Sequence, residues 1–180
     1  SVNRMTNLMT QLRSGTRQTE QSDIDLAELL KFVLAECKLR TPIPELVLGD
    51  GKFTLTCDRN RLQTVFEHLI QNAQEATGKG GHVTVRLLSS NGSAVVEIED
   101  DGIGMNEHFV QHRLFKPFDS TKGLTGMGIG AFESREFIRS LGGNINVKST
   151  PGRGSVFHVS IPCLEASDIR HTNRSARGNT

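Results

Sequence analysis

One asparagine lies at an unexpected place in an amphipathic segment. Asn72 belongs to HLIQNAQEA (residues 68–76), within a stretch whose apolar residues recur at helical spacing. Asparagine favours caps and turns over helix interiors, because its side chain competes for backbone hydrogen bonds. On a helical wheel Asn72 falls at the border of the apolar face, with His68 and Glu75 on the adjacent polar face. An amide there can reach a cleft, although such a residue is more often bonded to backbone.

Two carboxylates and two glycines follow a predicted strand. The segment IEDDGIGM (98–105) ends that strand in Asp100 and Asp101 and continues with Gly102 and Gly104. A carboxylate at a strand end can accept a hydrogen bond from an exocyclic amine, and glycines let the backbone approach a ligand closely. Taken alone, this pattern is also typical of an ordinary turn.

A glycine-rich loop opens the last predicted helix. In LFKPFDSTKGLTGMGIGAF (114–132), four glycines surround the start of that helix. The N–H groups and the positive dipole end of a helix attract phosphate, and Lys122 adds a mobile ammonium that can meet a terminal phosphate. The spacing is not that of a P-loop, and no strand directly precedes the loop as a dinucleotide-binding βαβ unit requires.

The order and spacing of these segments resemble the Bergerat-type ATP-binding domain of sensor histidine kinases. HLIQNAQEA is similar to the N box of that family, DDGIGM to the G1 box, LFKPFDSTK to the F box and TGMGIGAF to the G2 box. The closing GGNINVKSTPGRGSVFHVSIP is similar to the family's last hairpin, so the resemblance covers roughly residues 23–162. The F and G2 region most resembles the histidine kinase of exosortase-linked exopolysaccharide systems.

The resemblance implies a role for each matching residue, with ATP and Mg²⁺ as the bound species. Asn72 is the expected Mg²⁺ ligand, in keeping with the oxygen ligands that Mg²⁺ prefers, and Asp100 is the expected acceptor for the adenine amine. Lys122 is expected to contact the terminal phosphate and to form the catalytic group with Asn72 and His68, under a lid of residues 106–125. The further predicted nucleotide-binding residues are Glu75, Gly102, Gly104, Phe115, Phe118, Thr121, Gly126, Met127 and Gly128. For the two phenylalanines, plain core packing is an alternative that is compatible with anchoring the lid.

The sequence also departs from the family pattern. His68 stands where many histidine kinases have a second Asn and related hydrolytic ATPases a water-activating Glu. It shares a face with Asn72, and both a contact with Mg²⁺-bound water or phosphate and a merely polar surface role are open. Leu124 stands near where the G2 box often begins with Gly, and Asp101, where Asn is frequent, is expected to be a turn residue. None of the six histidines lies in a helical phosphoacceptor motif, so we expect the acceptor histidine upstream of this chain.

The composition indicates a globular domain without a nucleic-acid partner. The 180-residue chain has a net charge of +1, and none of its apolar runs approaches the length of a transmembrane helix. Its three widely spaced cysteines indicate reduced thiols and a cytoplasmic setting. We expect the full-length protein to be a homodimer, and anchorage at the inner membrane is compatible with this assignment.

The predicted elements give an α/β two-layer sandwich, with helices on one face of a mixed sheet and a lid over the nucleotide. Residues 1–20 are expected to be the end of a dimerisation helix and a linker, 21–163 the catalytic domain, and 164–180 a polar disordered tail. Asp25 and Asp58 are predicted to cap the first two helices of that domain. We expect strands at 46–48, 53–57, 82–89, 93–99, 144–148 and 155–161, a helix over 126–141, and an irregular segment at 101–125.

Three functions follow from these observations. The preferred one is a protein-histidine kinase domain, which transfers the γ-phosphoryl group of ATP to a histidine of the dimerisation domain, for onward transfer to a response regulator. An ATP hydrolase is disfavoured because position 68 lacks Glu and the F box contains Lys122. A nucleotide-binding scaffold without catalysis is disfavoured because Asn72, Asp100 and Lys122 are all intact.

Overall fold

The strands form two sheets. In the computed structural model, which describes residues 20–117 and 129–165, they are β1 (Gln21–Asp25), β2 (Glu45–Leu48), β3 (Phe53–Asp58), β4 (Val83–Ser90), β5 (Ser93–Asp100), β6 (Asn144–Thr150), β7 (Gly154–Pro162) and β8 (Leu164–Glu165). One sheet has the order β2-β4-β5-β7-β6, with β2 parallel to β4 and the other neighbours antiparallel. Strands β1, β3 and β8 form a separate antiparallel sheet. Asn91 and Gly92, at φ of 49° and 75°, make the predicted tight turn between β4 and β5.

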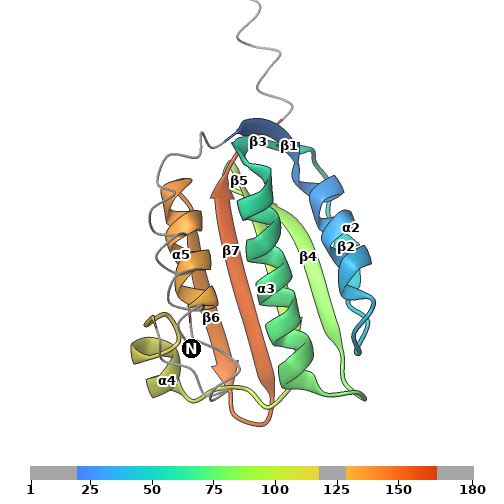
Figure 1. The fold of residues 1–180 in the computed structure, drawn as a ribbon, viewed down its shortest axis with the longest axis vertical. Helices are drawn as coiled ribbons and strands as arrows, with labels where there is room; N and C mark the ends of the chain where they lie inside the picture. Colours follow the sequence, from blue (N-terminus) through green and yellow to red (C-terminus); the bar gives the residue numbers. More distant parts are fainter. Residues whose placement is uncertain (1–19, 118–128, 166–180) are drawn as a thin grey trace, which may run out of the picture.

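Three helices lie side by side across one face of the larger sheet (Figure 1). They are α2 (Leu26–Cys37), α3 (Arg59–Thr77) and α5 (Gly130–Ser140). The carboxylates of Asp25 and Asp58 accept hydrogen bonds from backbone N–H groups in the first turns of α2 and α3, as predicted. Each such cap stabilises its helix by about 1 kcal/mol. The predicted α/β sandwich, with helices on one face of a mixed sheet, is confirmed.

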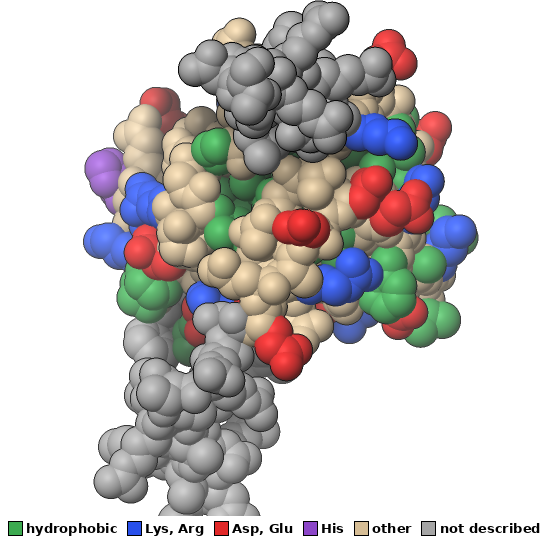
Figure 2. Space-filling view, turned by 90° about the horizontal axis from the view of Figure 1, so that it is seen from above, with side chains coloured by type: hydrophobic (Ala, Val, Ile, Leu, Met, Phe, Trp, Pro, Cys, Tyr) green, Lys and Arg blue, Asp and Glu red, His purple; other side chains and the backbone are tan. Residues whose placement is uncertain are grey.

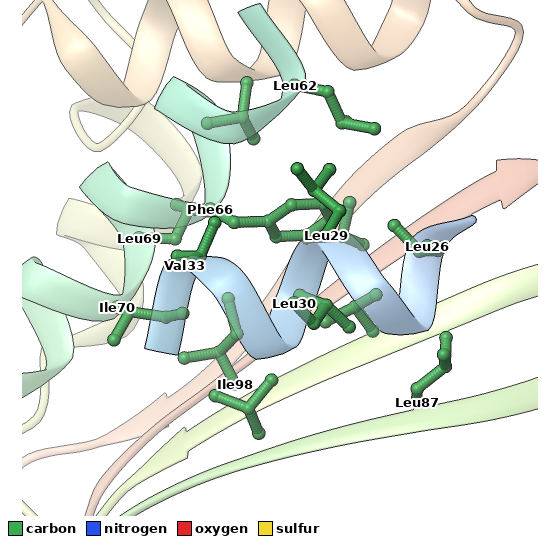
Figure 3. Close-up of a cluster of buried hydrophobic side chains, with 14 of the residues drawn as sticks. Leu26, Leu29, Leu30, Val33, Leu62, Phe66, Leu69, Ile70, Leu87 and Ile98 are labelled. Atoms are coloured by element: carbon green, nitrogen blue, oxygen red, sulfur yellow. The ribbon is translucent and has the colours of Figure 1, made fainter. Parts of the chain in front are cut away.

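The core lies between α2, α3 and the sheet. In Figure 3 the apolar side chains of the two helices point toward one another and toward Leu87 of β4 and Ile98 of β5. The labelled helical residues, all buried, are Leu26, Leu29, Leu30, Val33, Leu62, Phe66, Leu69 and Ile70. Burying one such side chain contributes about 1.5–3 kcal/mol. This face therefore fixes the rotation of α3 about its axis, and with it the direction of the residues along its polar edge.

A short helix lies within the segment that was predicted to be irregular. Helix α4 (Glu107–His112) begins after Asn106, whose side-chain oxygen accepts the N–H of Phe109 at 2.8 Å. A segment of this length carries too few turns to display an apolar period. The prediction of an irregular connection is therefore wrong for these residues.

Most strand boundaries differ from the expectations by one or two residues, and two further differences lie at the last helix and at the predicted tail. The last helix, predicted from residue 126, begins at Gly130 in the described part of the chain. At the other end, β8 pairs with β3 through Leu164 and Glu165, where the polar tail was expected to start. Pairing with a distant strand stabilises these two residues, and no local pattern indicates it.

Charged side chains of both signs are interspersed over the face shown in Figure 2. This distribution agrees with the net charge of +1 for the whole chain. Within the described residues, every helix is too short or too polar to traverse a bilayer.

Candidate nucleotide-binding site

A buried carboxylate ends β5. Asp100 is only 4% exposed, and its Oδ1 accepts the backbone N–H of Gly102 at 3.0 Å. Burial raises the pKa of the Asp100 carboxyl, although backbone N–H groups of Gly102 and Ser155 partly offset this effect. Because a carboxylate has about four acceptor sites, two N–H donors use only part of its capacity. Asp100 is therefore a pre-oriented acceptor for a donor group such as an exocyclic amine.

The two glycines of the G1 box are required by close packing of the chain on itself. A Cβ on Gly102 would lie 2.4 Å from the carbonyl oxygen of Ala76 at the end of α3. Gly104 has a φ of +65°, and a Cβ there would lie 2.0 Å from the carbonyl oxygen of Thr150. Between them, the N–H of Ile103 donates to Ala76 O at 3.1 Å. The turn after Asp100 is therefore clamped between α3 and the β6–β7 turn, and contact of these glycines with a nucleotide stays a prediction.

A serine that the sequence analysis did not single out completes this clamp. The N–H of Met105 donates to Ser149 Oγ at 2.7 Å, and the Ser149 hydroxyl lies 3.0 Å from Gly154 O and 2.9 Å from Ser155 Oγ. Ser155 is also the residue whose N–H faces Asp100. The strand β6 thus helps to position the carboxylate, through a contact that no local pattern predicts.

Asp101 does more than occupy a turn. Its Oδ1 accepts the N–H of His82 at 2.7 Å, and its Oδ2 lies 3.0 Å from Nδ1 of the same histidine. These contacts lower the pKa of the Asp101 carboxyl. A Cβ on Gly81 would lie 2.4 Å from Asp101 Oδ1, so the connection from α3 to β4 passes directly over this carboxylate. Asp101 therefore joins that connection to the turn that follows Asp100.

On α3, Asn72 and His68 form a pair. The Asn72 amide nitrogen lies 2.8 Å from His68 Nε2, and both side chains are partly buried. The His68 ring also lies against the first residue of α5, because a Cβ on Gly130 would be 2.2 Å from its Cε1 atom. The shared helical face predicted for the two residues is confirmed, and the contact with α5 was not foreseen.

The far end of α3 is fastened to the connection between α2 and β2. Gln74 is 2% exposed, and its Nε2, which has two hydrogens to donate, lies within hydrogen-bond distance of the carbonyl oxygens of Cys37, Arg40 and Pro42, at 3.0, 3.1 and 2.8 Å. The neighbouring Glu75 forms an ion pair with Arg40 at 3.4 Å, and both side chains are largely exposed. Glu75 therefore helps to hold this connection, and its predicted contact with a nucleotide stays a prediction.

One of the two predicted lid anchors is described. Phe115 packs against the core, and the guanidinium of Arg135 on α5 lies 4.5 Å from the centre of its ring. The same guanidinium donates to the Phe115 carbonyl oxygen at 3.4 Å. This contact ties the middle of the predicted lid segment to α5. The predicted site residues outside the described part of the chain are Phe118, Thr121, Lys122, Gly126, Met127 and Gly128.

The donor groups fit a magnesium ion that is held chiefly by its substrate. Within residues 20–117 and 129–165, no three His, Cys, Asp or Glu side chains are placed to hold a metal ion together. Mg²⁺ commonly takes one or two oxygen ligands from the protein and the rest from phosphates and water. The single amide oxygen of Asn72, the predicted ligand, agrees with a site in which phosphates and water supply the remaining ligands of Mg²⁺.

Comparisons with known proteins agree with this geometry. Sporulation kinase E of Bacillus subtilis is 31% identical over 150 residues, which cover 82% of this chain and 20% of that protein. Sporulation kinase C of the same organism is 36% identical over 142 residues, which cover 76% of this chain and 33% of that protein. The chain thus spans a third or less of the length of these two curated relatives.

Solved structures agree with the fold. The catalytic domain of histidine kinase ThkA matches with a TM-score of 0.69 and 28% identity, over 81% of this chain and 97% of that one. The mycobacterial sensor histidine kinase MprB matches with a TM-score of 0.71 and 22% identity, over 81% of this chain and 99% of that one, which supports the fold alone. The family model described as histidine kinase-, DNA gyrase B- and HSP90-like ATPase matches residues 57–165, which is more than half of the chain. This chain therefore belongs to that ATPase family, as an ATP-binding catalytic domain of the kind found in sensor histidine kinases.

Proposed function

We propose that this domain transfers the γ-phosphoryl group of ATP to a histidine on a dimerisation domain outside this chain. From there the phosphoryl group passes to an aspartate of a response regulator. The observation that carries the proposal is the buried Asp100 carboxylate, which the Gly102 N–H orients at the end of β5. The names of the related histidine kinases support the reaction class.

Each residue has a distinct task in this proposal. Asp100 accepts the adenine amine, and as a carboxylate it offers acceptors only, which favours a base carrying an amine. Asn72 holds Mg²⁺ through its amide oxygen, and the bound ion would neutralise charge on the phosphates. Lys122 holds the terminal phosphate. Such a site works by positioning its substrate and by neutralising charge.

The residue at position 68 favours transfer over hydrolysis. Hydrolysis by general-base catalysis needs a basic atom within hydrogen-bond reach of the attacking water. Nε2 of His68 instead lies 2.8 Å from the Asn72 amide nitrogen. The adjacent residue, Glu67, also carries a carboxylate. That carboxylate accepts a hydrogen bond at 2.7 Å from Gln63, which lies one turn earlier on α3, so it too is engaged within the helix.

We further propose that the full-length protein is a cytoplasmic-facing homodimer anchored at the inner membrane, within an exosortase-linked exopolysaccharide system. The support for the exopolysaccharide system is the sequence of the F and G2 region, residues 114–132. Replacing Asn72 by Ala in the chromosomal gene should then abolish regulation of exopolysaccharide production. Unchanged production in that strain would argue against this assignment.

The metal role of Asn72 is tested by calorimetry of ADP binding with and without Mg²⁺. Asn72→Ala should weaken binding mainly when Mg²⁺ is present, because the lost atom contacts the ion rather than the base. Asn60→Ala, an exposed residue in the first turn of the same helix, is the matched control. An equal loss with and without Mg²⁺ would contradict the ligand role.

The reaction is tested with labelled ATP. The chain alone should bind ATP without becoming phosphorylated, and slow transfer should appear when a separate domain carrying the upstream histidine is added at high concentration. Release of free phosphate without transfer would identify a hydrolase, and binding with neither reaction would identify a scaffold. Acid-labile label on one of the chain's own six histidines would show that the acceptor is internal.

A further inference from the structure

We propose that His68 is a positioning residue that sets the rotation of the Asn72 amide, so that the amide oxygen rather than the nitrogen is presented to the metal ion. This inference rests on the metal role proposed above for Asn72. It assigns His68 a task that requires contact with neither the nucleotide nor the ion. The two residues are one helical turn apart on α3.

The first step is the chemistry of the contact between the two side chains. The Asn72 amide nitrogen lies 2.8 Å from His68 Nε2. An amide nitrogen can only donate, so Nε2 must be the acceptor, and the neutral ring carries its proton on Nδ1. Rotating the amide by half a turn would bring its oxygen to Nε2, which would be favourable only if the ring proton moved from Nδ1 to Nε2. The contact therefore turns Oδ1 of Asn72 away from the ring.

The second step is the position of the ring itself. A Cβ built on Gly130 would lie 2.2 Å from Cε1, 2.3 Å from Nε2 and 2.7 Å from Nδ1 of His68. These distances are shorter than real Cβ contacts, so the edge of the ring lies directly against the backbone at the start of α5. The ring cannot move toward α5, and Nε2 is held at Asn72. His68 thus links the proposed metal ligand to the helix that follows the glycine-rich loop.

The third step explains why a histidine suits this position. An asparagine at position 68 is one methylene shorter than a glutamine, so its amide would end closer to the helix than Nε2 of histidine does. A glutamine has the reach of Nε2 and can place an oxygen there. A leucine fills similar space without any acceptor. The series His68→Gln, His68→Asn and His68→Leu therefore separates orientation of the amide from simple packing.

The binding experiment measures ADP affinity of the whole chain by calorimetry, with and without Mg²⁺. His68→Leu should weaken binding about two- to tenfold when Mg²⁺ is present, the loss expected for one oriented hydrogen bond, and should leave Mg²⁺-free binding unchanged. His68→Gln should retain more of the Mg²⁺-dependent affinity than His68→Leu or His68→Asn. In an Asn72→Ala background, His68→Leu should cause no further loss, because residues that act through one another are not additive.

The outcomes separate this inference from the proposed function. If Asn72→Ala lowers Mg²⁺-dependent affinity and His68→Leu does not, the orienting role is wrong and the metal role stands. Additive losses, or equal losses with and without Mg²⁺, would also overturn the orienting role. If Asn72→Ala leaves Mg²⁺-dependent affinity intact, the metal role fails and this inference fails with it.

A second measurement needs neither nucleotide nor metal. Nitrogen-15 NMR of the chain, at a pH where imidazole is neutral, should show the His68 proton on Nδ1. Asn72→Leu should shift the ring toward the Nε2-protonated tautomer, because the donor that favours the other form is removed. A wild-type ring protonated on Nε2 would overturn the inference even if a position 68 variant failed to fold.

Discussion

Replacing Asp100 by Asn should separate ligand binding from folding. Asp100 is 4% exposed, and its carboxylate accepts the N–H of Gly102 at 3.0 Å. In the variant, the amide oxygen of Asn can accept the same N–H. The amide nitrogen, however, would place a donor where the adenine amine must donate. The loss of a charge-assisted hydrogen bond is worth about 1.5–3 kcal/mol. Because each 1.4 kcal/mol is a factor of about ten, ADP affinity should fall roughly ten- to hundredfold.

Folding of this variant should be preserved, because burial of the wild-type charge is unfavourable. Burial raises the pKa of Asp100, so the folded chain binds the proton more tightly than the unfolded chain. Stability from this group therefore falls as pH rises through the interval between the unfolded and the folded pKa. At neutral pH, Asp100→Asn should unfold at the same temperature as wild type or at a higher one.

The assay is calorimetric titration with ADP, accompanied by thermal unfolding of the ligand-free chain. Asp50→Asn, in an exposed turn, is the matched control and should behave as wild type in both measurements. Because burial raises the pKa of Asp100, wild-type affinity should also fall on acidification as Asp100 takes up a proton, and the Asp100→Asn variant should lack that component. Normal ADP affinity in Asp100→Asn, with its fold intact, would refute the assignment of Asp100 to the adenine amine.

Three further perturbations test the elements around the site. Gly104→Ala should lower the free energy of unfolding in urea by about 1–3 kcal/mol. The loss should exceed that of Gly152→Ala, since Gly152 also has a positive φ but its added Cβ meets no atom within 4 Å. Equal losses would show that backbone strain alone, and not the close contact, matters. Asp101→Asn should destabilise the chain near neutral pH, because contacts with His82 lower the Asp101 pKa. Stability from this group is present above the unfolded pKa and is lost as pH falls through the folded pKa, so melting temperatures of variant and wild type should converge in acid. Gln74→Leu should cost about 1–3 kcal/mol by leaving buried carbonyl groups without their donor, yet calorimetry should show wild-type ADP affinity in the folded protein.

Much of the fold follows from interactions between residues that are close in sequence. The apolar period predicted the buried faces of α2 and α3, and Asp25 and Asp58 predicted where these helices begin. Asn91-Gly92 predicted the hairpin between β4 and β5. Side-chain caps, tight turns and amphipathic faces act within a few residues, so the sequence alone is enough to identify them.

The sequence also placed the candidate site residues Asn72 and Asp100 on a helix and at a strand end that the structure contains. The resemblance to the N and G1 boxes assigned Asn72 and Asp100 to the helix and the strand end where they lie. The shared face of His68 and Asn72 follows from their spacing of four residues. What these residues would bind was inferred from the order of the motifs, because each motif alone is also typical of an ordinary turn or helix border.

Tertiary structure alone decided which partners hold those residues in place. Ser149 reaches the N–H of Met105 from 44 positions away along the chain, and Gln74 reaches the Cys37 carbonyl from 37 positions away. The His68 ring meets the backbone of α5 at Gly130. Such contacts depend on how the strands pair and on how the helices pack across the sheet. A serine, a glutamine or a glycine carries no local pattern that names its distant partner, so the folded chain was needed to find them.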